Sequence, residues 1–186
     1  MLETILKGKT AAILAKDGFE QCELLQTRDA LIAAGIKVHI VSIEPGSIIG
    51  WDDHKWGVEV EVDKVVKGLS ASQYDALILP GGLFNPDALL QDKEAIDFVK
   101  GFFGCKVSKP VVAINRGAWM LLQADVLRNR LVTLYPDVLS RLRHAGAKLV
   151  DRDLVIDIDL FTSRTSANLA ALNQQVIQHI SKQSPH

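Results

Sequence analysis

A sharp break near the middle of the chain places an asparagine where many enzymes hold a nucleophile. The apolar run Val111 to Ile114 predicts a buried strand, and Asn115-Arg116-Gly117 follows it directly. A strand that turns into a helix through one residue forms an elbow, and the side chain of that residue stands over the sheet. Enzymes place a serine or cysteine nucleophile there. Asparagine tolerates the left-handed backbone of such an elbow, but its neutral carboxamide attacks poorly. If Asn115 is only a turn residue, covalent catalysis at this position is equally unexpected.

Two further loops suit the same kind of site. One runs from Asp17 to Glu23 and the other from Pro80 to Asp87, each after a predicted strand. Because ligands bind at the carboxyl ends of strands in open α/β sheets, we expect both loops to converge with the elbow. The adjacent Gly81 and Gly82 allow backbone N–H groups to approach a ligand, although taken alone they are better explained by a tight turn.

Strands and helices alternate along the chain, and this pattern positions the loops. The expected strands are Thr10–Ala15, Lys37–Ile43, the half-exposed Val58–Val62, Asp75–Leu79, Val111–Ile114 and Val155–Ile158, and the expected helices cover Leu24–Ile32, Ile96–Phe103, Trp119–Leu122, Asp137–His144 and Leu169–Ile180. Apolar strands that alternate with amphipathic helices predict an α/β fold, with a mostly parallel sheet covered on both faces. We find no linker or repeat, so residues 1–186 are expected to form one domain, with a core at about 10–181.

Composition excludes several classes of partner. The formal net charge of the 186 residues is −1, which gives no electrostatic reason to expect nucleic acid or an acidic membrane surface. The first residues are too charged for a signal peptide, and no run approaches the roughly 20 apolar residues of a membrane helix. Two cysteines, Cys22 and Cys105, cannot form a disulfide framework, and no histidine has metal-ligand spacing. We therefore expect a cytoplasmic protein without metal or cofactor.

These segments together resemble the ThiJ/PfpI superfamily, in particular its branch of PfpI-type intracellular proteases and amidases. The matching segments, in order, are Asp17–Leu24, Ile49–Trp51 with Asp63, Tyr74–Gly82, Asn85–Asp87, Lys109–Ile114, Ala145–Ala147 with Val150–Asp151, and Thr162–Arg164. The resemblance covers nearly the whole chain. It implies a flavodoxin-like three-layer sandwich related to class I glutamine amidotransferases, and a homo-oligomer of two or more subunits.

The elbow departs from the pattern of this family at its reacting group. The family sequence Ala-Ile-Cys-His-Gly-Pro corresponds here to Ala113–Ala118, so Asn115 replaces the cysteine and Arg116 the histidine. The resemblance also implies that Glu23 is the carboxylate near the nucleophile, that Gly82 and Arg116 are the backbone oxyanion donors, and that Asp87 is an acidic residue supplied across a subunit contact. An arginine stays protonated at physiological pH, so it cannot shuttle protons as the histidine does.

Three functions are compatible with these residues. The first is an inactive homologue that binds a small carbonyl or carboxylate ligand or acts in stress-related interactions, which we favour. The second is a residual glyoxalase, deglycase or amidase activity that uses Glu23, Gly82 and Asp87 with water or another nucleophile. Cys22 could be that nucleophile, although a buried small hydrophobic residue near the start of a helix is the simpler interpretation. The third is a structural partner in a mixed oligomer. We also expect Arg116 to turn inward, pair with Glu23 and close the pocket.

Overall fold

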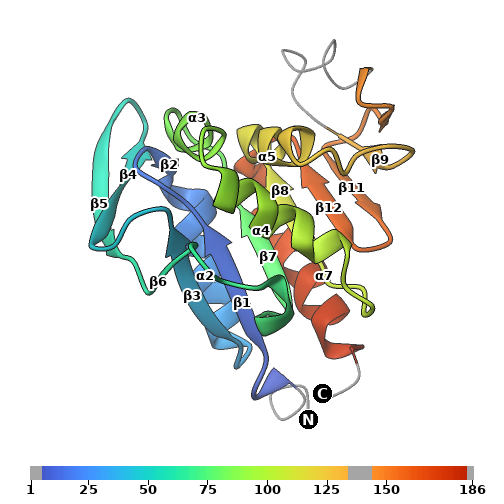
Figure 1. The fold of residues 1–186 in the computed structure, drawn as a ribbon, viewed down its shortest axis with the longest axis horizontal. Coiled ribbons are helices and arrows are strands. Elements are labelled where there is room, and N and C mark those ends of the chain that lie inside the picture. The colour runs from blue at the N-terminus through green and yellow to red at the C-terminus, as the bar shows by residue number, and fades with distance from the viewer. Residues whose placement is uncertain (1–5, 134–143, 184–186) are drawn as a thin grey trace.

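A seven-stranded sheet forms the centre of the protein (Figure 1). In this computed structural model, which describes residues 6–133 and 144–183, the strand order is β11-β12-β8-β7-β1-β3-β6. The strands are β1 (Thr10–Leu14), β3 (Lys37–Ser42), β6 (Lys64–Val65), β7 (Ala76–Leu79), β8 (Val111–Ile114), β11 (Leu154–Asp157) and β12 (Leu160–Ser163). All neighbours pair in parallel except β11, which is antiparallel to β12. The predicted mostly parallel sheet is confirmed.

Helices cover both faces of this sheet and bury two apolar clusters. The helices are α2 (Gln21–Ala33), α3 (Asn85–Leu89), α4 (Lys93–Phe103), α5 (Trp119–Gln123) and α7 (Leu169–Ser181). Alternate residues of a strand face opposite sides, so Leu77 and Leu79 pack in the cluster with α4 and α5, whereas Ile78 packs in the cluster with α2 and α7. The three layers of the predicted fold follow from this division (Figure 1).

Smaller elements surround the central sheet. The strands β2 (Phe19–Glu20), β4 (Ser47–Asp52) and β5 (Lys55–Glu61) form a second sheet, and β9 (Leu131–Val132) pairs with β10 (Lys148–Leu149). Short 3₁₀ helices are η1 (Ala71–Gln73), η2 (Asn115–Ala118) and η4 (Ser166–Asn168). In Figure 1 the β4–β5 hairpin extends beside the loops at the carboxyl ends of the parallel strands.

Most predicted elements are confirmed, and the differences have local causes. The sequence pattern missed β4, which is interrupted by an irregular pairing between Ile49 and Trp51, and β12, in which two of the four buried residues are polar. Residues 137–143 of the predicted Asp137–His144 helix lie outside the described residues. Within the described ranges, no helix is both long enough and apolar enough to cross a bilayer.

Candidate functional site

The elbow has the backbone geometry that the sequence predicts. Strand β8 ends at Ile114, and Asn115, the first residue of η2, follows with a positive φ of 52°; α5 comes directly after η2. Gly117 lies so close to the end of β7 that an added Cβ would be 2.1 Å from the carbonyl oxygen of Leu79. An asparagine therefore occupies the left-handed position, and a glycine lets the following turn pack against the neighbouring strand.

The three loops predicted to form the site do converge. A Cβ added to Gly81 would lie 3.1 Å from Glu23 Oε2, 3.1 Å from the Ile114 carbonyl oxygen and 3.2 Å from the Arg116 backbone nitrogen. Gly82 has a φ of 122° and forms a bridge to Phe19 in the first loop. A Cβ on Gly82 would lie 2.2 Å from the Gly18 carbonyl oxygen, so Gly82 is required for this approach, whereas a Cβ on Gly81 would be tightly packed.

Glu23 lies buried beneath this junction, in a setting that favours its protonated form. Its Oε2 accepts a hydrogen bond of 2.7 Å from the Gly81 backbone N–H, and its Oε1 has no hydrogen-bond partner among the described residues. Burial raises the pKa of Glu23 to about 8, an effect that the Gly81 N–H opposes and the nearby Glu20 carboxylate reinforces. The protonated carboxyl group has a hydrogen to donate, so Glu23 can act as a hydrogen-bond donor at this junction.

The predicted ion pair between Arg116 and Glu23 is wrong. Arg116 Nη1 donates instead to the carbonyl oxygens of Leu83 at 2.7 Å and Gly82 at 3.4 Å, and Nη2 lies 3.6 Å from Asp87 Oδ1. Its guanidinium also lies 5.6 Å from the ring centre of Trp119. Glu23 is fully buried and already accepts the Gly81 N–H, so it is less accessible to the guanidinium than the exposed Asp87 carboxylate. Arg116 therefore lies at the mouth of the site and leaves Glu23 unpaired.

Cys22, the candidate for an alternative nucleophile, lies near Glu23, but its surroundings do not activate its thiol. Cys22 is half-buried in the first turn of α2, and its Sγ lies 3.6 Å from Glu20 Oε1. Burial raises the pKa of the Cys22 thiol. A hydrogen bond with Ser166 opposes this increase, and the Glu20 and Glu23 carboxyl groups add to it. A raised pKa lowers the fraction of thiolate, so this setting disfavours a nucleophile. Cys105 donates to the carbonyl oxygen of Gly101 at the end of α4, far along the chain from these loops.

Two residues to which the sequence pattern gave no role, Asn85 and Ser166, also shape the site. The Asn85 carboxamide is buried and donates to the carbonyl oxygens of Pro80 at 2.9 Å and Gly81 at 3.1 Å, while its Oδ1 accepts the Lys16 N–H. It thereby fixes the glycine loop. Ser166 contacts Cys22 from the turn after β12. Ser166 follows the carboxyl end of β12, and it could not be recognised as a site residue because β12 itself was not predicted.

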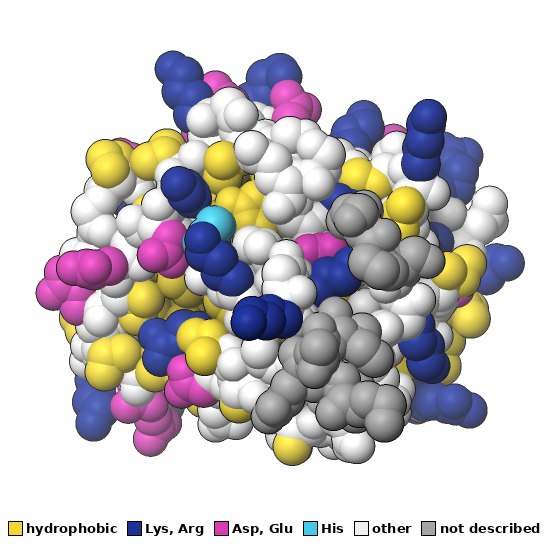
Figure 2. Space-filling view, turned by 90° about the horizontal axis from the view of Figure 1, so that it is seen from below, with side chains coloured by type: hydrophobic (Ala, Val, Ile, Leu, Met, Phe, Trp, Pro, Cys, Tyr) yellow, Lys and Arg dark blue, Asp and Glu magenta, His cyan; other side chains and the backbone are white. Residues whose placement is uncertain are grey.

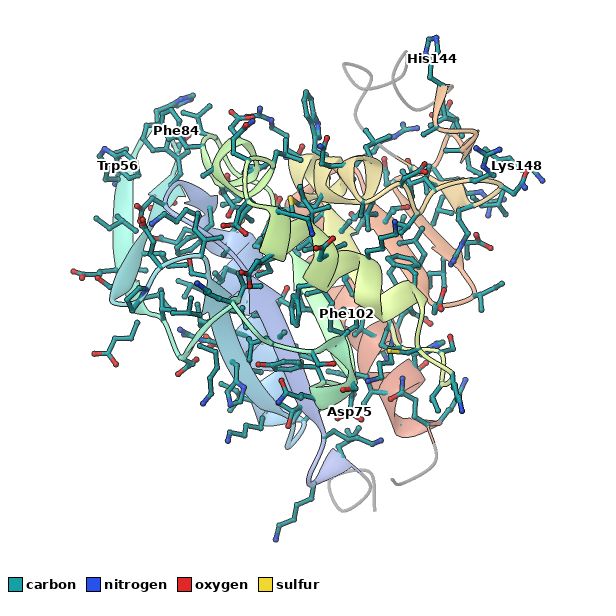
Figure 3. The ribbon with its side chains drawn as sticks, viewed as in Figure 1. Trp56, Asp75, Phe84, Phe102, His144 and Lys148 are labelled. Atoms are coloured by element: carbon teal, nitrogen blue, oxygen red, sulfur yellow. The ribbon has the colours of Figure 1, made fainter. Side chains whose placement is uncertain are left out.

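Three aromatic side chains, of which Trp56 and Phe84 are exposed, lie next to the mouth of the site. Trp51, Trp56 and Phe84 contact one another with ring centres 5.3–5.7 Å apart, and the Trp56 and Phe84 rings are stacked (Figure 3). Phe84 follows directly after Leu83, whose carbonyl oxygen binds Arg116. We call Trp51, Trp56 and Phe84 the aromatic group. Among the described residues, no set of three His, Cys, Asp or Glu side chains is arranged to hold a metal ion.

Comparison with known proteins identifies the family. The sequence profile of the DJ-1/PfpI family matches residues 9–179, so the chain belongs to this family. It is 33% identical to protein/nucleic acid deglycase 2 of Escherichia coli K12, over 92% of this chain and 97% of that protein. It is also 33% identical to general stress protein 18 of Bacillus subtilis strain 168, over 94% of this chain and 99% of that protein.

Solved structures have the same fold. A ThiJ/PfpI domain protein from Brachyspira murdochii superimposes with a TM-score of 0.84 at 20% identity, and the match covers 96% of this chain and 99% of that one. DJ-1 of Schizosaccharomyces pombe gives a TM-score of 0.78 at 20% identity, over 91% of this chain and 90% of that one. The α/β fold with its mostly parallel sheet is therefore that of the DJ-1/PfpI family.

Proposed function

We propose that this protein is a catalytically inactive member of the DJ-1/PfpI family that binds a small carbonyl or carboxylate compound at the elbow. The observation that carries the proposal is Asn115, which has the positive φ of an elbow residue but a neutral carboxamide in place of a nucleophile. Arg116, which follows it, stays charged and contacts Asp87 and Leu83 rather than a reacting group.

The groups around Asn115 support binding of an oxygen acceptor. Protonated Glu23 has no charge to repel a carboxylate, and its Oε1 has no partner among the described residues. The Arg116 guanidinium supplies positive charge at the mouth of the site. A ligand oxygen that accepts from the Glu23 acid and the Asn115 amide would satisfy hydrogen-bonding groups in a poorly solvated setting, where such bonds are stronger. We further propose a cytoplasmic location and, from the family, a homo-oligomer or a structural role in a mixed oligomer.

A residual enzymatic activity is the second candidate, because relatives at 33% identity are named deglycases. Glu23 would have to act with Cys22 or with water in place of the missing nucleophile. The raised pKa of Cys22 argues against the thiol, and neutral Glu23 would serve as an acid rather than a base at pH 7. These protonation states favour binding over catalysis.

Ligand binding is tested with pyruvate and acetate as probes. Amide resonances of Gly81, Gly82 and Arg116 are expected to shift on addition of pyruvate to the ¹⁵N-labelled protein, and Glu23→Ala is expected to weaken this binding about tenfold. Glu61→Ala, on the exposed face of β5, is the matched control and should bind as the wild type does. Resonances that do not move at millimolar pyruvate or acetate would contradict the proposed binding.

A further inference from the structure

A groove between α2 and α7 lies apart from the elbow site. The two helices pack against each other on one face of the sheet (Figure 1), and the groove between them has a volume of about 530 Å³. Small-molecule sites in proteins have volumes of roughly 300–1,000 Å³. Ala30 of α2, with Ala170 and Ile177 of α7, supplies the apolar part of the lining. Because alanine side chains are short, they leave space between the helices in which a flat ring can lie.

The polar part of this lining consists of carboxamide side chains. They belong to Gln26, Asn173, Gln174 and Gln178. Among the described residues, no charged side chain lines the groove, whereas Figure 2 shows Lys, Arg, Asp and Glu side chains spread over the lower end of the molecule. A charged ligand would lose hydration in the groove without gaining a partner of opposite charge. Each carboxamide has both donors and an acceptor, so the groove suits an uncharged compound that presents both kinds of group.

Asn173 is the residue that points to a ligand. It is only 5% exposed, and its Oδ1 is buried without a hydrogen-bond partner among the described residues. A carboxamide oxygen in this position is unfavourable, because it has lost its contact with water and gained no bond in return. No hydrogen bond to another described residue fixes the side-chain amide, so a half-turn about its last torsion angle would bring Oδ1 to the groove that Asn173 lines. A ligand with an N–H group would satisfy this oxygen.

We propose that the groove between α2 and α7 binds an uncharged, flat heteroaromatic compound that carries an amino group beside a ring nitrogen, as adenine does. The amino group would donate to Oδ1 of Asn173, and the ring nitrogen would accept from a carboxamide N–H. Asparagine and glutamine side chains form this pair of hydrogen bonds with adenine in other proteins. The ring would lie between Ala30 and Ala170. Because none of these residues belongs to the elbow site, this inference does not depend on whether the elbow binds a ligand.

The probes are adenine and purine, which differ only in the amino group. Titration of the ¹⁵N-labelled full chain with adenine is expected to shift the side-chain amide resonances of Asn173 and Gln174. Adenine should bind about tenfold more tightly than purine, because purine leaves Oδ1 of Asn173 without a partner. Asn173→Leu keeps the size of the side chain and removes the amide, so it should bind adenine only as well as purine. Urea unfolding shows that this variant is folded, as expected from the loss of an unpartnered buried oxygen.

A second variant fills the groove without touching an amide. Ala170→Leu should abolish adenine binding, whereas the matched control Ala171→Leu, at an exposed position of α7 outside the lining, should bind adenine as the wild type does. The proposal is overturned if neither probe binds at millimolar concentration, if adenine and purine bind equally, or if Ala171→Leu loses binding as Ala170→Leu does. It is also overturned, in favour of a second copy of this chain, if sedimentation shows self-association that Ala170→Leu disrupts and adenine leaves unchanged.

Discussion

Replacing Glu23 by glutamine is expected to stabilise the protein, and the gain should grow as the pH rises. Glu23 is buried with one oxygen unpartnered among the described residues, and its pKa in the folded protein is about 8, against 4.5 for an ordinary glutamate. Between these values the unfolded chain releases the proton while the folded protein keeps it. The unfolding free energy of the wild type therefore falls by about 1.4 kcal/mol per pH unit across this range because of this one group.

The sign and the size of the stability difference between Glu23→Gln and the wild type follow from this difference in proton binding. Below about pH 4.5 both states are protonated, so Glu23→Gln should differ little from the wild type. At pH 7.5 the variant should be more stable by about 4 kcal/mol, since it has no charge to lose on unfolding. Above about pH 8 the difference should stop growing, because both states are then ionised in the wild type.

Urea unfolding followed by circular dichroism at pH 5, 6, 7 and 8 measures this difference. Subtracting wild type from variant at each pH cancels the titration of all other groups. Glu61→Gln removes the same carboxylate from an exposed strand position and should give a small difference without this slope. A stability difference between Glu23→Gln and wild type that stays flat from pH 5 to 8 would refute the reasoning that Glu23 is held neutral.

Three further substitutions test the elbow and the core by the same unfolding measurement. Asn115→Ala should be about 1 kcal/mol less stable than Asn115→Gly, because alanine resists a φ of 52°, and equal stabilities would show that the elbow is not strained. Gly117→Ala should cost about 3 kcal/mol or more, since its Cβ would lie 2.1 Å from the Leu79 carbonyl oxygen, and a variant as stable as wild type would show that this packing is wrong. Phe102→Ala should cost about 3–5 kcal/mol, because the ring is buried against Phe98 with centres 5.3 Å apart, and a loss below about 1 kcal/mol would place it outside the core.

Much of the fold could be predicted because the inner strands are uniformly apolar. β7 and β8 are buried on both faces, so Ala76–Leu79 and Val111–Ile114 read as continuous apolar runs that end in glycine-rich turns. β12 could not be recognised in this way, since Thr162 and Ser163 are buried polar residues whose hydrogen bonds come from distant segments and turns. A pattern of hydrophobicity carries no information on such partners.

The sequence was enough to predict which residues converge at the site, but not which acidic residue Arg116 contacts. The convergence of Glu23, Gly81 and Asn115 follows from the order of parallel strands, which the alternation of elements already indicated. The direction of Arg116 did not follow, because its long side chain can reach either of two acids. The choice depends on protonation, since burial keeps Glu23 neutral, and on the exposed Asp87 and the Leu83 carbonyl oxygen nearby. Burial of one carboxyl group is a tertiary property that residue spacing does not reveal.

The most direct test of the central claim is methylglyoxal consumption by the purified protein beside Asn115→Cys with Arg116→His. We expect the wild type to be inert and the double variant to gain turnover, because the elbow, Glu23 and the glycine loop remain in place around a restored thiol. A triple variant that adds Glu23→Gln should lose most of this gain. Turnover by the wild type would contradict the claim that Asn115 ends covalent chemistry at this site, and it would direct attention to Cys22.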